Sequence, residues 1–286
     1  MRIVVTAGYG RSLHAIVLLH ELSRRGHSVV ACLEVSTLNL ARARAYLRQL
    51  GWRRLANKVR ARFTSGHVAG HFADEVAPMR QMLVERSIGS RSVRSAAAAI
   101  GARHVVVPDL NNRRALDELR RVAPDVVAYA GGGIVKKEFL SVPVRGVLNV
   151  HGGPLPAFRG MNAAEWAVLH GVTPACVAHW MEATVDTGPM LAARETPMHG
   201  LRSIAHLRGV MTRMSVELML DAIDAVAEGR AVPTPQQRAA GRLFHVMAAP
   251  MLEVVEQRLR SGAALSSGDV FQFRAPPAAV PTHAAL

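Results

Sequence analysis

The first third of the chain alternates short apolar runs with segments whose apolar residues recur every three or four positions. The run RIVV at residues 2–5 is short and rich in β-branched residues, which is typical of a buried strand. Helical spacing follows in Ala15, Leu18, Leu19 and Leu22. Ser12 stands where a helix N-cap is expected, and Gly26 stands where the helix would end. A second strand is predicted over residues 28–32.

The same alternation continues to residue 150. Helices are predicted around residues 93–100 and 115–122, and strands in the segments HVVVPDL, PDVVAYA and GVLNV. Short β-rich runs separated by helices are typical of a mostly parallel sheet that helices cover on both faces. The pattern therefore predicts an α/β protein with a Rossmann-like, mostly parallel sheet.

The pattern changes after residue 200. A long helix is predicted over residues 203–228, ending at Gly229, and a second helix over residues 250–261 follows a connection that contains proline. The final segment RAPPAAVPTHAAL is too rich in Pro and Ala to pack. We therefore expect an α/β domain in 1–200, a small, mainly helical C-terminal extension in 201–270 and a disordered tail in 271–286.

Length and composition narrow the class of protein. The chain has 286 residues, of which 50% are hydrophobic, so it can bury a full core. No apolar run reaches the roughly 18 residues of a membrane span, and the N-terminus lacks the pattern of a signal peptide. Cys32 and Cys176 are the two cysteines, which excludes a disulfide framework and a CxxC zinc site. We expect a cytoplasmic protein without a membrane span.

Positive charge is concentrated in one segment. The formal net charge is +14, and no acidic residue lies between Glu34 and Asp74. The basic segment 42–62 could bind nucleic acid, an anionic membrane surface or a phosphorylated substrate. Apolar residues recur through the same window at helical spacing, at Trp52, Leu55, Val59 and Phe63. We favour an amphipathic surface helix over a nucleic-acid site.

Two polar side chains stand at the end of the strand predicted in GVLNV. Asn149 and His151 are two residues apart, so they project to the same side of a strand, and Gly152-Gly153-Pro154 then ends it. Open parallel sheets bind ligands at this edge. An amide beside an imidazole can donate hydrogen bonds to an oxyanion that forms during acyl transfer. The alternative is an Asn that caps a turn and a His that binds the backbone.

Several other residues are open to two interpretations. Asp186, in the segment EATVDTGPML, is by itself an ordinary turn residue before Thr-Gly. His179 is either a packed histidine or a contact of the substrate. His67 and His71 are spaced for metal binding from one helix face, but no further ligand accompanies them, so no metal site is expected. Trp166 and Trp180 are expected to be core aromatics.

Three motifs in order carry a resemblance to a known family. NVHGGPLPAFRG together with VDTGPML resembles the folate-dependent formyltransferases, whose members carry Asn-x-His, Leu-Pro-x-x-Arg-Gly and Asp-x-Gly at about this separation. PDVVAYAGGGIVKKEFL is similar to the strand and loop that precede Asn-x-His in that family, and the likeness extends from Met1 to about residue 200. The resemblance implies a formyltransferase fold and a catalytic domain in 1–200.

The resemblance also implies the chemistry. By position, Asn149, His151 and Asp186 match the catalytic triad of the family. Asn149 and a protonated His151 would face the oxygen of the formyl group of 10-formyltetrahydrofolate. Asp186 would keep His151 protonated and order a water that relays the proton from the attacking amine. The reaction needs neither a metal nor an acyl-enzyme.

The cofactor and acceptor sites are expected on either side of the triad. In the family the pterin lies against two backbone segments, which here are Gly131, Gly132, Gly133, Ile134 and Val135, and Met181, Glu182, Ala183 and Thr184. The HGG at 151–153 departs from the common His-Pro-Ser, which affects the shape of the acceptor side. Candidate substrate-binding residues are Gly8, Gly10 and Ser12 in the turn GYGRSL, and Arg159 in the Leu-Pro-x-x-Arg-Gly loop. A dinucleotide site in that turn is disfavoured, because Leu13 replaces the third glycine.

The identity of the acceptor stays open at this level. Relatives of this kind formylate methionyl-tRNA, glycinamide ribonucleotide or amino sugars, and the mainly helical segment after residue 200 favours a small-molecule amine such as an amino sugar nucleotide. Hydrolysis of 10-formyltetrahydrofolate and formylation of methionyl-tRNA are the alternatives. A non-catalytic binding protein would lack one of the three triad residues, and all three are present. The oligomeric state is open, with a homodimer as one candidate.

Overall fold

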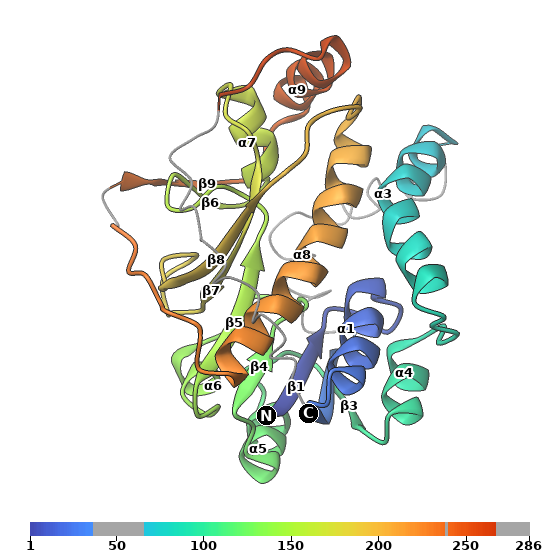
Figure 1. Ribbon diagram of the computed structural model, residues 1–286, viewed down its shortest axis with the longest axis vertical. Helices are drawn as coiled ribbons and strands as arrows, with labels where there is room; N and C mark the ends of the chain where they lie inside the picture. Colours follow the sequence, from blue (N-terminus) through green and yellow to red (C-terminus); the bar gives the residue numbers. More distant parts are fainter. Residues whose placement is uncertain (37–65, 238–239, 267–286) are drawn as a thin grey trace, which may run out of the picture.

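The computed structural model describes residues 1–36, 66–237 and 240–266, without the side chains of residues 66–72. Within these ranges seven strands form one sheet in the order β3-β2-β1-β4-β5-β7-β8 (Figure 1). The strands are β1 (Arg2–Ala7), β2 (Ser28–Val35), β3 (Arg103–Val107), β4 (Val126–Ala128), β5 (Gly146–His151), β7 (Ala175–Trp180) and β8 (Met190–Glu195). The first five in this order are parallel, and β7 and β8 continue the sheet antiparallel. The predicted α/β class and the mostly parallel sheet are confirmed.

Helices cover both faces of this sheet (Figure 1). They are α1 (Leu13–Arg24), α3 (Gly66–Glu85), α4 (Val93–Ala99), α5 (Arg113–Val122), α6 (Lys137–Leu140), α7 (Ala163–Leu169), α8 (Ile204–Ala227) and α9 (Ala249–Ser261). β1 shows the two-residue period of a strand buried on both faces. Its Ile3 and Val5 pack in the core cluster of α1, α3, α4 and α8, and its Val4 packs in the cluster of α5 and α6.

The predicted helix boundaries agree with the caps. The Ser12 hydroxyl accepts a hydrogen bond from the Ala15 amide at 3.3 Å and caps α1. Ser203 caps α8 in the same way, through the His206 amide at 3.1 Å.

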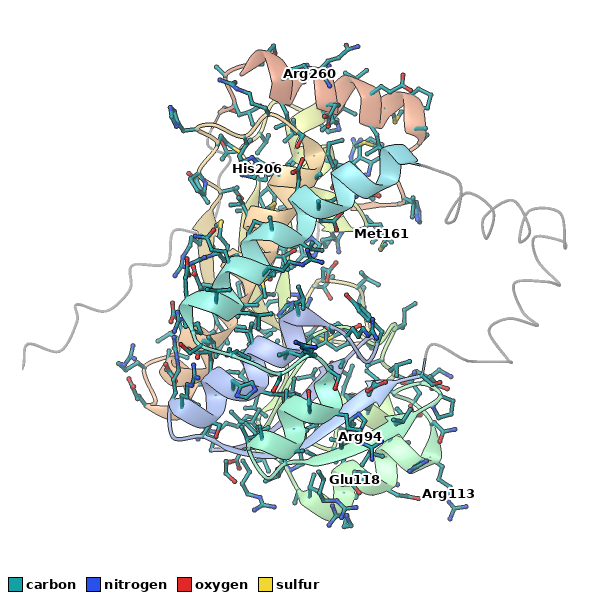
Figure 2. All side chains as sticks on the ribbon, turned by 90° about the vertical axis from the view of Figure 1, so that its right-hand side faces the viewer. Arg94, Arg113, Glu118, Met161, His206 and Arg260 are labelled. Atoms are coloured by element: carbon teal, nitrogen blue, oxygen red, sulfur yellow. The ribbon has the colours of Figure 1, made fainter. Side chains whose placement is uncertain are left out.

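Arg113 of α5 and Arg260 of α9 lie at opposite ends of the molecule (Figure 2). None of the helices in the described ranges has the length and apolar character that a membrane crossing requires.

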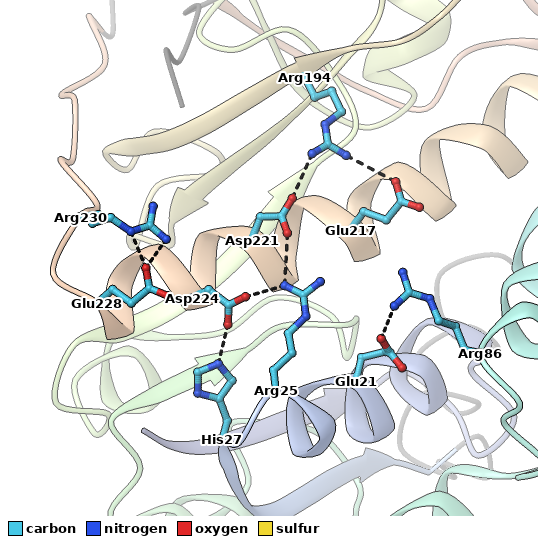
Figure 3. A network of polar contacts seen from close by, with 10 residues as sticks. All are labelled: Glu21, Arg25, His27, Arg86, Arg194, Glu217, Asp221, Asp224, Glu228 and Arg230. Carbon is cyan, nitrogen blue, oxygen red and sulfur yellow. Dashed lines mark hydrogen bonds and ion pairs between the residues drawn. The ribbon is translucent and has the colours of Figure 1, made fainter. Parts of the chain in front are cut away.

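The long helix α8 belongs to the main core rather than to a separate extension. Its Leu207, Val216 and Ile223 are fully buried in the same cluster as Ile3 and Leu18. A network of charged side chains also joins it to the end of α1 and to the sheet: Arg25, which follows α1, binds Asp221 and Asp224, and Arg194 of β8 binds Asp221 and Glu217 (Figure 3). The domain boundary at residue 200 stays a prediction, and no break in the core coincides with it.

Two short strands were not expected from the sequence. β6 (Phe158–Gly160) and β9 (Arg242–Phe244) form a separate parallel pair. Among the described residues after 200, α8 and α9 are joined by a non-helical connection that includes β9, and β9 returns to the Leu-Pro-x-x-Arg-Gly loop. The expectations for the basic segment 42–62, for the side chains of His67 and His71 and for the tail 271–286 lie outside the described residues.

Candidate active site

Asn149 and His151 lie at the carboxyl end of β5, beside the antiparallel strand β7. The register pairs Asn149 with His179 and His151 with Val177. The Asn149 side chain reaches the ring of His179, with Nδ2 3.2 Å from Nε2. His151 and His179 are 7% and 1% exposed, so both rings lie inside the protein.

Asp186 joins these residues from the loop between β7 and β8. Its Oδ2 accepts a hydrogen bond from the Gly160 amide at 2.9 Å and lies 3.3 Å from Nδ1 of His151. Its Oδ1 lies 3.6 Å from Nε2 of His179. The structure therefore brings together Asn149, His151 and Asp186, with His179 between the amide and the carboxylate. We call these four side chains the polar cluster.

The hydrogen bonds of His179 show which ring nitrogen carries its proton. Nδ1 lies 2.9 Å from the carbonyl oxygen of Trp180, which can only accept, so Nδ1 donates. Burial lowers the pKa of His179 to about 4 against the opposing attraction of Asp186, so the ring is neutral at pH 7. Its Nε2 therefore carries no proton and accepts from the Asn149 amide. His179 thus orients Asn149.

His151 faces an acceptor at each ring nitrogen. Its Nε2 lies 2.8 Å from the carbonyl oxygen of Phe158, and its Nδ1 faces Asp186. Only the protonated imidazolium donates to both acceptors at once. The Nδ1 contact, at 3.3 Å, is longer than the roughly 2.7 to 2.9 Å of a strong charge-assisted bond, so this N–H is held loosely.

The Leu-Pro-x-x-Arg-Gly loop supports the carboxylate through its backbone. Gly160 has φ +93°, and a Cβ there would lie 2.3 Å from the carbonyl oxygen of Phe244 in β9. A side chain at this position would displace β9 or move the amide that binds Asp186. Arg159 does not contact the polar cluster: its Nη2 donates to the Gly241 carbonyl at 2.9 Å, and its Nε is buried without a partner among the described atoms.

The predicted pterin segment Gly131–Gly133 follows β4, the parallel neighbour of β5. All three glycines have positive φ, and the Gly131 carbonyl accepts from the Thr6 hydroxyl at 2.7 Å. Ile134 is 81% exposed and Val135 is buried. The other predicted segment, Met181–Thr184, continues from β7, and the Met181 amide donates to the Val147 carbonyl at 2.8 Å. Both segments lie at the ends of strands next to β5.

The predicted substrate turn follows β1 and lies at the carboxyl edge of the parallel strands, as the glycine run does. A Cβ at Gly8 would lie 3.6 Å from the Gly132 amide, so this turn touches the glycine run. A Cβ at Gly10 would lie 2.8 Å from Oε1 of Glu34. The Ser12 hydroxyl is engaged as the cap of α1. Gly8 thus adjoins the predicted pterin wall.

A cavity of about 360 Å³ opens beside His151, between β5, α7 and α8. Its polar lining includes Asn162, Glu165, Arg208, Thr212 and Ser215. Glu165 is 3% exposed and is bound by Nε and Nη2 of Arg208 at 2.6 and 2.5 Å. Neither segment 131–135 nor segment 181–184 lines this cavity. Sequence reasoning missed Glu165 and Arg208, which lie 43 residues apart and carry no motif.

The fold and the polar cluster define an α/β protein that gathers an amide, two imidazoles and a carboxylate beyond the ends of its parallel strands, where open sheets bind ligands. The family model described as Formyl transferase matches residues 64–223, more than half of the chain. The chain belongs to the formyl transferase family.

Relatives and solved structures agree with this assignment. A methionyl-tRNA formyltransferase of Pelobacter propionicus is 36% identical over 123 residues, covering 42% of this chain and 39% of that protein. The enzyme of the same name from Myxococcus xanthus is 34% identical over 145 residues, covering 50% of this chain and 45% of that protein. The chain thus spans less than half the length of these relatives.

Two solved structures share the fold at low identity. Glycinamide ribonucleotide transformylase 1 from Symbiobacterium toebii superposes with a TM-score of 0.55 at 19% identity, covering 83% of this chain and 94% of that chain. A sugar N-formyltransferase from Shewanella sp FDAARGOS_354 has a TM-score of 0.53 at 11% identity, covering 94% of this chain and 89% of that chain. The expected formyltransferase fold is confirmed.

Proposed function

We propose that the protein transfers the formyl group of 10-formyltetrahydrofolate to the amine of a small-molecule acceptor. The proposal rests on one observation: Asn149 and His151 of β5 meet Asp186, which comes from the distant loop between β7 and β8. Family membership supports it, because the matched residues 64–223 include all three side chains. The particular acceptor, the cytoplasmic location and the oligomeric state are further predictions.

The glycine run fits a flat ring that is recognised by backbone groups. Gly131, Gly132 and Gly133 offer amides and carbonyls without side chains in the way, next to the strand end that carries Asn149. We place the pterin there and along Met181–Thr184. The formyl carbon then lies over the polar cluster.

Three groups act on the reacting atoms. When the acceptor amine attacks the formyl carbon, negative charge develops on the formyl oxygen. Asn149 donates one Nδ2 hydrogen to that oxygen while the other is held by His179. His151 offers its loosely held Nδ1 proton to the same oxygen. Asp186 stabilises the imidazolium and orders the water that carries the proton from the attacking to the leaving nitrogen.

The cavity beside His151 supports transfer to an amine rather than to water. Its volume of about 360 Å³ accommodates a small molecule, and its lining from α7 and α8 carries hydroxyl, amide and charged groups. We place the acceptor there, with its amine toward His151. Methionyl-tRNA is the second candidate acceptor, because the methionyl-tRNA formyltransferases of Pelobacter propionicus and Myxococcus xanthus match this chain in sequence.

A screen of acceptors tests the proposal. The protein is incubated with 10-formyltetrahydrofolate and a pool of amines that includes amino sugars, their nucleotide-linked forms and methionyl-tRNA, with the His151→Ala protein as background. Mass spectrometry should find one amine that gains a formyl group together with an equal amount of tetrahydrofolate. Tetrahydrofolate with free formate and no formylated amine would instead identify a hydrolase. No consumption above the His151→Ala background would refute both.

A further inference from the structure

The connection between α8 and β9 crosses the loop that carries Asp186. Thr234 in this connection forms an antiparallel bridge with Met190, and each amide donates to the other's carbonyl at 2.8 Å. Two residues later, Nε2 of Gln236 donates to the Gly188 carbonyl at 2.6 Å and to the Asp186 carbonyl at 3.2 Å. One side chain therefore holds the backbone at Asp186 and two residues beyond it.

The amide of Gln236 has one orientation in this contact. Both of its partners are carbonyl oxygens, so only the NH₂ end can face them. Its Oε1 is buried without a partner among the described atoms. A buried acceptor without a partner is unfavourable, and the two donor bonds keep the amide there nonetheless. The contact is thus specific to a side chain that donates twice at this length.

Asp186 has a backbone that needs support. Its φ is +53°, in the left-handed region that non-glycine residues seldom adopt. Its carboxylate is 13% exposed and makes contacts at 2.9, 3.3 and 3.6 Å with Gly160, His151 and His179. A displacement of about 1 Å would break the contact with His151, and misplacement of that size in an active site can lower a rate about a hundredfold.

The same C-terminal connection also supports the other partner of the carboxylate. In β9 the Phe244 carbonyl accepts from the Met161 amide at 3.0 Å, next to the Gly160 amide that binds Asp186. Asp186 is therefore held from two sides: Gln236 holds its backbone, and β9 holds the loop whose Gly160 amide donates to its carboxylate.

We propose that Gln236 is a positioning residue that fixes the Asp186 carboxylate against His151 and the Gly160 amide. The geometric part of this inference is independent of the reaction, and its effect on catalysis rests on the proposed function.

A pair of matched substitutions tests the inference. Gln236→Met removes both donors while keeping the side chain near its length and uncharged. Gln237→Met makes the same change at the exposed neighbour, which contacts neither Asp186 nor Gly188. The chemical shift of the Gly160 amide proton, which donates to the Asp186 carboxylate, is compared by NMR in the three proteins without any substrate.

We expect the Gly160 amide proton to move upfield in Gln236→Met, because its hydrogen bond to the carboxylate lengthens when the backbone of Asp186 loses its support. Gln237→Met should give the wild-type signal. If formyl transfer is observed, kcat should fall about tenfold in Gln236→Met with the KM for 10-formyltetrahydrofolate unchanged. A mere loss of stability would not move the Gly160 signal of the folded protein.

An unchanged Gly160 amide signal in folded Gln236→Met overturns the inference, whatever the activity. If that protein does not fold, Gln236→Asn is measured instead, because it keeps the amide but withdraws it by one methylene. It should move the Gly160 signal in the same direction, and wild-type behaviour would overturn the inference equally. Absence of formyl transfer in the wild type refutes the proposed function alone and leaves the NMR result to decide the role of Gln236.

Discussion

The neutral state of His179 has a consequence for stability that can be measured without knowing the acceptor. The ring is 1% exposed, and burial lowers its pKa from 6.5 to about 4. The unfolded chain therefore takes up a proton as the pH falls through 6.5, whereas the folded chain resists it until about pH 4. Stability that is fully present above pH 6.5 is lost through this window as the pH falls.

The magnitude follows from the two pKa values. With a pKa of 6.5 in the unfolded chain and about 4 in the folded chain, the contribution of His179 falls by roughly 2 to 3 kcal/mol between pH 7.5 and pH 4.5. Burial also lowers the pKa of His14 to about 4. His14 is present in every protein compared, so its effect cancels in the difference between wild type and a His179 variant.

The assay is urea unfolding of the wild type, His179→Gln and His206→Gln at pH 7.5 and pH 4.5. His206 is an exposed residue of α8 and serves as the matched control. Between pH 7.5 and pH 4.5, the free energy of unfolding should fall by roughly 2 to 3 kcal/mol less in His179→Gln than in the wild type. The His206→Gln protein should follow the wild type. Each protein is compared with itself at the two pH values, so the packing defect caused by the substitution cancels. An equal pH dependence in all three would refute a neutral, buried His179.

Other predictions concern the supports of the site. Asp186→Asn removes the charge that faces His151 while keeping an oxygen for the Gly160 amide, so kcat for formyl transfer should fall roughly a hundredfold or more; a rate within threefold of wild type would contradict this role. Gly160→Ala places a Cβ 2.3 Å from the Phe244 carbonyl and should lower the free energy of unfolding by roughly 1 to 3 kcal/mol, measured in urea, whereas no loss would mean that β9 adapts freely. Arg208→Met leaves Glu165 buried without its partner and should destabilise the protein, by less than the roughly 3 to 5 kcal/mol of a fully buried pair because Arg208 is 38% exposed. Adding Glu165→Gln should recover most of that loss, and a double variant no more stable than Arg208→Met would argue against the pair.

Local patterns predicted most of the fold. The cap at Ser12, the start of a helix at residue 203 and the two-residue spacing of Asn149 and His151 involve neighbours along the chain, so the sequence shows them directly. β6 and β9 have three residues each, which is too few for a period to be recognised. The position of α8 in the main core depends on distant partners, and its own pattern does not reveal them.

The candidate site was also hard to predict where its contacts join distant parts of the chain. Asp186 was found through a motif, because residues 35 positions apart form no helix or strand pattern that would show its contact with His151. His179 joins the polar cluster because the register of β7 places it opposite Asn149, and a register between strands cannot be read from one strand alone. Gln236 acts on backbone carbonyls 48 and 50 residues away, a type of contact that leaves no residue pattern at all.

The most direct test of the central claim is the rate of tetrahydrofolate formation from 10-formyltetrahydrofolate, with the acceptor found in the screen, for wild type and Asn149→Ala. The account predicts that Asn149→Ala folds like the wild type by circular dichroism and transfers the formyl group at least roughly a hundredfold more slowly, because a donor to the developing oxyanion is lost. Equal rates in the two folded proteins would contradict it.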